Sequence, residues 1–166
     1  MATDYESRYL SQPGAVGLFT RLTRVGLLVE AFQHRCLDPF GLRFIDYSVL
    51  RVLQLAGRPH RMSPTALAEI VLRSSGGMTQ ILDRLERAGY VVRTADPSDR
   101  RKVAVELTPA GLALAQDANA SYERERQRLL SELSEDEVEE LDRAVHRLLE
   151  VLSADARAEA ALAENV

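Results

Sequence analysis

Residues 96–107, DPSDRRKVAVEL, decide the fold because they join a turn, a cationic tip and the start of a strand. Proline, serine and two aspartates are typical of a turn, and three cations follow at or just past its tip. From Val103 to Leu107 every second residue is a large apolar one, which is the period of a half-buried strand. Residues 90–94 (Tyr-Val-Val-Arg-Thr) predict the paired strand. The stretch is therefore a β-hairpin whose charged tip is either solvated surface or a contact to a polyanion.

The residues before the hairpin predict two short helices separated by a tight turn. Ser63-Pro64 is typical of a helix start, because a hydroxyl caps the helix and proline fits its first position. This helix runs to about Leu72. Residues 73–77 (Arg-Ser-Ser-Gly-Gly) form the turn and cap a second helix from about Ser75 to Ala88. The apolar face of the second helix consists of Met78, Ile81, Leu82 and Leu85.

Helix, turn, helix and hairpin in this order are typical of a DNA-binding helix-turn-helix with a wing. Small residues in the first turn of the second helix allow close approach to DNA, and the positive end of the helix dipole favours a phosphate. Gln80 suits adenine, and Arg84 suits guanine or a phosphate. The alternative is an ordinary solvated helix. The helix offers seven candidate DNA contacts: Ser74, Ser75, Gly76, Gly77, Thr79, Gln80 and Arg84.

Further helices flank this region. Residues 13–38 carry an apolar stripe at steps of three and four, namely Leu18, Leu22, Val25, Val29, Phe32 and Cys36. Other helices are predicted at residues 43–56, 108–133 and from the capping box 134–137 onward. In the last helix Val138, Leu141, Val145, Leu148 and Leu152 repeat as a heptad seam, which suits either a helical partner or packing within the monomer. The sequence thus predicts a mainly α fold with a small β-hairpin.

The charge of the chain is unevenly distributed, although its net value is only −4. Residues 73–102 hold seven cations and four anions, whereas residues 117–166 hold fourteen anions and six arginines. Binding to a phosphate backbone depends on the local field rather than on the total charge. We therefore expect the first region to face DNA and the acidic end to face away from it.

Other features argue against several classes of protein. The three histidines are widely spaced, and the chain has neither a phosphate-binding glycine loop nor a nucleophile motif. We therefore expect no enzyme, no catalytic residue, no metal and no cofactor. The chain lacks an apolar run of membrane length and a signal peptide, and its single cysteine, Cys36, cannot form an intrachain disulfide. A cytoplasmic location without a membrane partner is the simplest interpretation.

The segment from about Leu18 to Leu152 resembles the MarR family of winged helix-turn-helix regulators. The wing signature of that family, D-x-R-x-x-x-V-x-L-T, is matched at every fixed position by residues 99–108 (DRRKVAVELT). Residues 74–79 (SSGGMT) and 82–91 (LDRLERAGYV) also resemble the recognition helix of the family.

The resemblance implies a homodimer whose first helix and last two helices interlock and present two winged units to a pseudo-palindromic operator in double-stranded DNA. It divides the chain into an N-terminal dimerisation helix (11–41), a winged helix-turn-helix lobe (42–107), C-terminal dimerisation helices (108–153) and a tail (154–166). It implies that Arg101 enters the minor groove, that Asp99 orients it, and that Arg100 and Lys102 contact the backbone. Narrow minor grooves attract such arginines.

Most members of the family repress transcription, often of neighbouring genes, and release DNA when a small anionic or phenolic ligand binds between the dimerisation helices and the lobe. An aromatic acid or its coenzyme A thioester would suit aromatic side chains combined with a cation or an imidazole. The alternative is that the aromatic residues belong to the core and the arginines are solvated. The candidate effector residues are His34, Arg35, Phe40, Arg43, Phe44 and Tyr47.

Two further hypotheses remain open. In the first, the repressor senses oxidants through Cys36, although this cysteine lies on the apolar stripe near the end of its helix, where a thiol is usually inert packing. In the second, the winged helix is a protein-interaction module that never binds DNA. The excess of cations in residues 73–102 argues against the second hypothesis.

Overall fold

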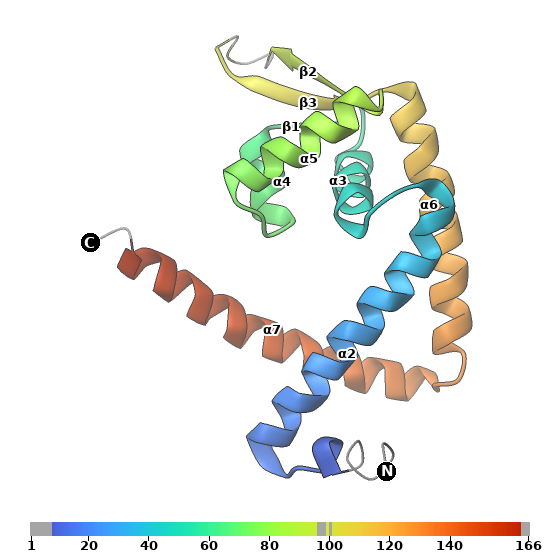
Figure 1. Ribbon diagram of the computed structural model, residues 1–166, viewed down its shortest axis with the longest axis vertical. Coiled ribbons are helices and arrows are strands. Elements are labelled where there is room, and N and C mark those ends of the chain that lie inside the picture. The colour runs from blue at the N-terminus through green and yellow to red at the C-terminus, as the bar shows by residue number, and fades with distance from the viewer. Residues whose placement is uncertain (1–7, 96–98, 100, 164–166) are drawn as a thin grey trace. The chain divides into compact units, whose positions relative to one another are not determined.

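The computed structural model describes residues 8–95, 99 and 101–163, with the side chains of 159–163 excluded. The chain divides into two compact units, Met1–Glu123 and Arg124–Val166. Figure 1 shows the helices and strands along the chain. The turn residues Asp96, Pro97 and Ser98, and also Arg100, lie outside the described residues.

The elements follow the order expected for a winged helix-turn-helix with flanking helices. They are α2 (Gly14–Leu37), the 3-10 helix η1 (Asp38–Phe40), α3 (Phe44–Leu55), β1 (Arg61–Met62), α4 (Pro64–Ile70), α5 (Ser75–Arg87), β2 (Val91–Ala95), β3 (Val103–Leu107), α6 (Pro109–Leu130) and α7 (Glu135–Ala163). This confirms a mainly α fold with a small antiparallel sheet. One end differs from the prediction, since α6 stops at Leu130 and not near residue 133; α7 continues through the Ala- and Glu-rich segment to Ala163.

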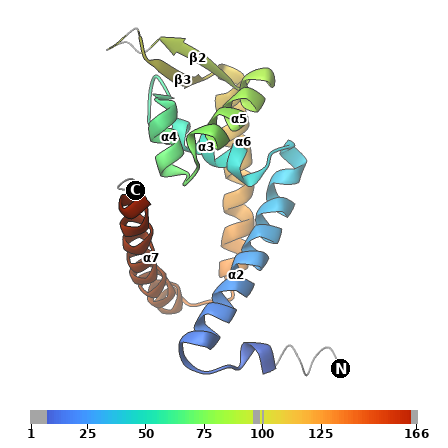
Figure 2. The same ribbon diagram turned by 60° about the vertical axis from the view of Figure 1, so that its left-hand side comes forward.

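The sheet contains a strand that the sequence did not predict. Its order is β1-β3-β2, and both neighbours pair antiparallel with β3. In β1, Arg61 pairs with Glu106 in the backbone register, and its guanidinium binds the carboxylate of Glu106, with Nε 2.9 Å from Oε2. Figures 1 and 2 show the β2–β3 hairpin extending past the helices of the lobe.

The burial of β3 differs from the simple alternation expected for a half-buried strand. Val105 and Leu107 are buried as expected, but Ala104 is buried too, and Val103 near the hairpin tip is 47% exposed. Ala104 is therefore the one departure towards the core side, and Glu106 between Val105 and Leu107 is half-buried.

The core of the first unit lies between α3, α4, α5, the sheet and the ends of α2 and α6. The fully buried large side chains are Leu37, Val49, Leu50, Leu53, Leu67, Met78, Leu82, Leu85, Val91 and Val105. The four predicted apolar residues of α5 are all among the buried side chains. The stripe of α2 is buried only at its end, at Phe32 and Cys36, while Leu18, Val25 and Val29 are exposed.

Hydroxyl caps start the helices of the lobe where the sequence predicts them. Ser63 Oγ accepts from the N–H of Ala66, 3.2 Å away, and Ser74 Oγ accepts from the N–H of Gly77 at the same distance. Each cap satisfies one of the helix-start N–H groups that have no partner within the helix. The caps therefore fix where α4 and α5 begin.

The start of α6 is tied to the end of α5 through Thr108 and Gly111. The Thr108 hydroxyl donates to the carbonyl of Gly89 at 2.7 Å and accepts from the N–H of Gly111 at 3.0 Å. The Thr108 N–H donates to the carbonyl of Tyr90 at 3.0 Å. A Cβ on Gly111 would lie 2.0 Å from the oxygen of Tyr90, so only glycine allows this close approach.

In the second unit, α7 begins with the predicted capping box. The N–H of Ser134 donates to Glu137 Oε2 at 2.8 Å, and the N–H of Glu137 donates to Ser134 Oγ at 3.3 Å. These hydrogen bonds, first that from the backbone of Ser134 and then that from its hydroxyl, lower the pKa of Glu137 from 4.5. The cap therefore stabilises α7 above the ordinary pKa and is lost as pH falls through the lowered one.

We expect Gly111→Ala to destabilise the protein by about 2 kcal/mol or more, because the added methyl group meets rigid backbone of Tyr90. Chemical denaturation followed by circular dichroism measures the change. Gly76→Ala is the matched control, since a Cβ there meets nothing within 4 Å and alanine favours a helix over glycine by roughly 1 kcal/mol. Equal midpoints for Gly111→Ala and the parent would contradict the steric argument.

Candidate nucleic-acid interface

The first half of α5 presents polar side chains to solvent. Five of the predicted contacts, Ser74, Ser75, Gly76, Thr79 and Gln80, are exposed, and Gly77 is half-buried. The Thr79 hydroxyl donates to the carbonyl of Ser75 at 3.0 Å, as is usual within helices. Met78 and Ile81 anchor the opposite face in the core. This end of the helix combines free polar surface with the positive end of the helix dipole.

Arg84, in the second half of α5, is engaged within the protein rather than directed at a ligand. Its Nε lies 3.2 and 3.1 Å from the two carboxylate oxygens of Asp46, and its Nη2 also binds Oδ1. The Asp46 side chain is 5% exposed and that of Arg84 33%. The expected pairing of Arg84 with guanine or a phosphate stays a prediction, and the structure adds that its Nε and Nη2 serve a buried carboxylate.

A second set of contacts joins α5 to the wing. Arg93 in β2 donates through Nη2 to Asp83 Oδ1 at 2.6 Å and through Nη1 to Glu86, and its backbone N–H donates to Glu86 Oε1 at 3.0 Å. Partial burial lowers the pKa of Arg93, but the hydrogen bonds from Asp83 and Glu86 outweigh it, so the pKa is raised. Arg93 thus fixes the base of the hairpin to the recognition helix.

At the tip of the wing, Asp99 organises the backbone and the side chain of Arg101. The Asp99 carboxylate accepts from the N–H of Arg101 at 3.1 Å and from its Nε at 3.2 Å. The Asp99 carbonyl accepts from the N–H of Lys102 at 2.8 Å. The side chain of Arg101 is 92% exposed, so Asp99 orients it without burying it. The predicted contact at Arg100 lies outside the described residues.

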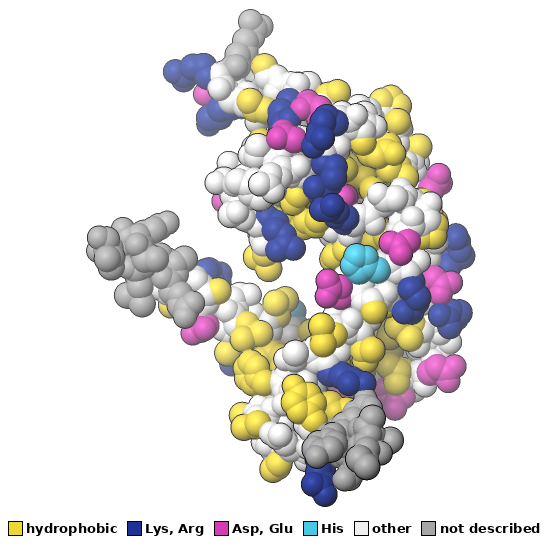
Figure 3. All heavy atoms as spheres, viewed as in Figure 1, with side chains coloured by type: hydrophobic (Ala, Val, Ile, Leu, Met, Phe, Trp, Pro, Cys, Tyr) yellow, Lys and Arg dark blue, Asp and Glu magenta, His cyan; other side chains and the backbone are white. Residues whose placement is uncertain are grey.

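Cations gather on the lobe and at the hairpin tip. Figure 3 shows Lys and Arg side chains over α5 and its surroundings and at the tip, with carboxylates beside some of them. The contacts explain the mixture: the carboxylates of Asp83, Glu86 and Asp99 each hold an arginine. The arginine at the wing tip, Arg101, remains 92% exposed although Asp99 contacts it.

The six predicted effector residues separate into two groups. Phe44 and Tyr47 of α3 join Phe32 of α2 and Tyr122 of α6 in an aromatic cluster, with ring centroids 5.5 to 6.4 Å apart. Tyr47 is buried and its hydroxyl donates to Asn119 Oδ1 at 2.9 Å, whereas Phe44 is 37% exposed. Sequence reasoning missed Tyr122 as a member, since nothing in the spacing of α6 links it to α3.

The remaining four candidates surround this cluster less closely. Arg35 lies with its guanidinium carbon 5.8 Å from the centroid of the Phe32 ring, a cation–π contact. Phe40 packs against the core, and Arg43 is exposed at the start of α3. His34 is exposed, with its Nδ1 4.0 Å from Asp38 Oδ1, and takes part in none of these ring contacts.

Comparison with known proteins decides the family. A model described as the MarR family matches residues 40–102. The regulator PecS of Dickeya dadantii, an HTH-type transcriptional regulator, is 30% identical over 116 residues, which cover 70% of each chain. The chain belongs to the MarR family.

Solved structures of MarR-family proteins have the same fold. CouR from Rhodococcus jostii, bound to p-coumaroyl-CoA, is 30% identical, with a TM-score of 0.69 over 83% of this chain and 95% of CouR. A cysteine-to-serine mutant of MarR from Escherichia coli, complexed with operator DNA, is 25% identical, with a TM-score of 0.69 over 82% of this chain and 99% of that one. This member of the MarR family is thus a winged-helix transcriptional regulator and not an enzyme.

Cys36 occupies a core position in this MarR-family chain. Its side chain is 5% exposed and lies in the same cluster as Phe32 and Leu37. A buried thiol in apolar surroundings behaves as a small hydrophobic side chain. The burial gives no support to the hypothesis that Cys36 senses oxidants.

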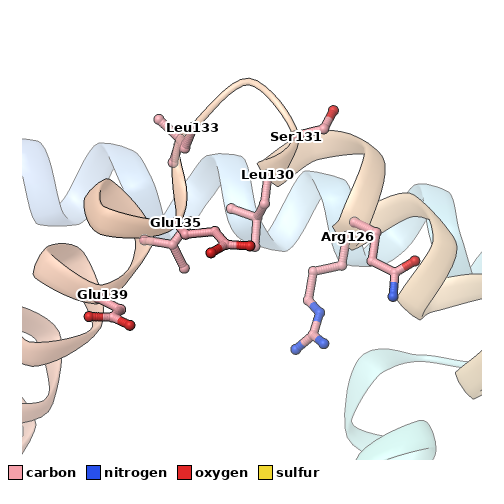
Figure 4. A pocket seen from close by; sticks show the side chains of 8 residues that line it. Arg126, Leu130, Ser131, Leu133, Glu135 and Glu139 are labelled. Carbon is pink, nitrogen blue, oxygen red and sulfur yellow. The ribbon is translucent and has the colours of Figure 1, made fainter.

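A groove of about 570 Å³ lies at the turn between α6 and α7 and is formed within the second unit. Figure 4 shows Arg126, Leu130, Ser131, Leu133, Glu135 and Glu139 around it. None of the predicted DNA or effector residues lines this groove. An adjoining depression adds Leu141 and Val145, so the groove and the depression belong to one exposed apolar strip.

Within residues 8–95, 99 and 101–163, no helix has the length and apolarity needed to cross a membrane.

Proposed function

We propose that the protein is a homodimeric repressor of neighbouring genes that binds a pseudo-palindromic operator. It releases this operator when a small aromatic acid or its coenzyme A thioester binds to the protein. The observation that carries DNA binding is the combination of an exposed polar helix start, at Ser75–Gln80, with an exposed wing arginine held by Asp99. A helix start of this kind suits the major groove, and an arginine at the wing tip suits the minor groove. The relative complexed with operator DNA supports the same use of the fold.

Gly76 gives separate support to a close contact at the helix start. It is exposed in the first turn of α5, its backbone does not require glycine, and a Cβ there would meet nothing within 4 Å. Glycine nevertheless disfavours a helix by roughly 1 kcal/mol relative to alanine. Glycine at position 76 therefore costs stability although the fold does not require it. A DNA backbone that approaches the helix closely would explain it, because a larger side chain would occupy that space.

Exposed apolar side chains on both units support the homodimer. In α2 they include Val16, Leu18, Phe19, Val25, Leu27, Leu28 and Val29, and in α7 they include Leu141, Val145, Leu149, Val151 and Leu152. The predicted heptad seam of α7 is therefore not covered by its own unit at Leu141, Val145 and Leu152. Apolar surface of this extent on a soluble chain indicates a protein partner. A second copy is the partner that the family implies.

The aromatic cluster supports an aromatic effector. Phe44 exposes an edge of the cluster, and Arg35 places a cation against Phe32, so rings and positive charge occur together. This chemistry suits an aromatic carboxylate or its thioester. The binding of p-coumaroyl-CoA by CouR is consistent with an effector of this class.

Replacing Arg101 by alanine is expected to weaken binding to operator DNA at least tenfold without lowering the melting temperature, because the side chain is 92% exposed and packs against no core residue. The slope of log K against log salt should fall by about 0.9. Fluorescence anisotropy at several salt concentrations measures both values. Arg128→Ala on α6, which removes an exposed arginine from the acidic unit, is the control and should change neither. Full affinity in Arg101→Ala would overturn the proposed role of the wing.

Gly76→Ala is expected to raise the stability of the protein and to weaken its binding to operator DNA. The methyl group favours the helix by roughly 1 kcal/mol but occupies the space that the DNA backbone needs. Thermal denaturation and anisotropy on the same preparation separate the two effects. A variant that is more stable and binds DNA as well as the parent would contradict close approach at this residue.

The effector class is testable with p-coumaroyl-CoA, p-coumarate, salicylate and free coenzyme A. We expect an aromatic acid or thioester to raise the melting temperature and release operator DNA, and coenzyme A alone to do neither. Phe44→Ala, which removes the exposed ring of the cluster, should retain DNA binding and lose the response. If none of the aromatic compounds changes either value, the proposed effector class is wrong.

A further inference from the structure

Asp46 is the charged side chain that the first unit buries most completely. Among the described residues it is the one charged group counted as buried, with 4% of its surface exposed. It lies in the first turn of α3 and binds Arg84 of α5 through both Nε and Nη2. Arg84 follows Gln80 by one helical turn. The ion pair therefore joins α3 to the recognition helix directly behind the face proposed to contact DNA.

The geometry of this contact fixes orientation as well as distance. A guanidinium that donates two parallel hydrogen bonds to a carboxylate defines a plane and a direction, whereas a single bond allows rotation. The first turn of α5 has no comparable restraint on its polar side, since its side chains there are exposed. The orientation of that turn therefore depends on its apolar anchors, Met78 and Ile81, together with the ion pair that holds the second half of the helix.

The other side of α3 is held by the aromatic cluster. Tyr47, the residue after Asp46, stacks with Tyr122 at 5.5 Å between centroids and donates to Asn119, both on α6. The start of α3 thus contacts the recognition helix through Asp46 and the ring of Tyr122 on α6 through Tyr47. A shift of α3 against the rings would be transmitted to α5 through Asp46 and Arg84.

We propose that Arg84 does not bind DNA but, held by Asp46, positions the recognition helix in the major groove and couples it to α3. Arg84 and Asp46 are positioning residues that act through the first turn of α5. This inference rests on the proposed binding of operator DNA.

Three variants test the positioning role: Asp46→Asn, Arg84→Lys, and the double variant Asp46→Asn/Arg84→Gln. The first removes the charge and keeps the shape, and the second keeps the charge and loses the paired donors. The double variant removes both charges and so leaves no buried charge unpaired. It is therefore expected to fold even if one of the single changes prevents folding. Operator affinity and its salt dependence are measured by anisotropy at a temperature where circular dichroism shows each variant folded.

We expect each variant to bind operator DNA about tenfold more weakly than the parent, with the salt slope unchanged. The double variant should be no weaker than the weaker single variant, since both residues act through one contact. Arg87→Gln is the matched control, because Arg87 lies one turn later on the same helix, is exposed, and donates to the carbonyl of Asp83 in its own helix. It should retain full affinity.

The alternatives give different results. A fall of about 0.9 in the salt slope for the double variant, whose Arg84→Gln change removes the cation, but not for Arg84→Lys or Asp46→Asn, would mean that Arg84 contacts a phosphate, which overturns the proposal. Folded variants with full affinity and only a lower melting temperature would show a purely structural pair, which also overturns it. Failure of the parent to bind any fragment from its own upstream region would instead refute the proposed DNA binding.

Discussion

The recognition helix α5 is held by ion pairs at its second half, and the rest of the lobe is arranged around this constraint. Arg84 ties it to Asp46 of α3, and Asp83 and Glu86 tie it to Arg93 of β2. Its apolar face is buried at Met78, Ile81, Leu82 and Leu85. Because core packing holds the apolar face along the helix and the charge pairs hold its second half, the polar side of the first turn is left exposed and is presented in a fixed direction.

The ion pair of Arg84 and the ion pairs of Arg93 have different roles in the lobe. Asp46 is nearly inaccessible, so its ion pair excludes water and gives a defined geometry, although such a pair contributes little net stability compared with apolar packing. The contacts of Arg93 are more exposed and strengthen the attachment of the wing to α5. The wing tip, held only by Asp99, keeps an almost fully exposed arginine. Rigidity is thus concentrated away from the surface that is proposed to meet DNA.

The burial of apolar residues distinguishes the interior of the first unit from the surfaces available to partners. Near its end α2 contributes Phe32, Cys36 and Leu37 to the core, while its earlier apolar residues remain exposed. The exposed seam of α7 repeats this pattern. A helix with more apolar surface than its own chain can cover is typical of an obligate partner contact.

The prediction from sequence succeeded where a property is local and failed where it depends on residues far apart in the chain. Hydroxyl caps at Ser63, Ser74 and Ser134 define helix starts because the capping hydrogen bonds span three residues. The wing signature at residues 99–108 is equally local. By contrast, β1 has two residues and no readable period, so only its pairing with Arg61 and Met62 opposite β3 reveals it.

The sequence by itself determined the helices, the hairpin, the family and the exposed polar start of α5, because periodicity, caps and a contiguous signature carry them. Only the tertiary structure decided that Arg84 pairs with Asp46, since this partner lies 38 residues earlier and is recognisable only once burial is known. It also decided that Tyr122 completes the aromatic cluster. In both cases the reason is the same: a side chain's chemistry follows from what packs against it, and packing between distant segments leaves no local pattern in the chain.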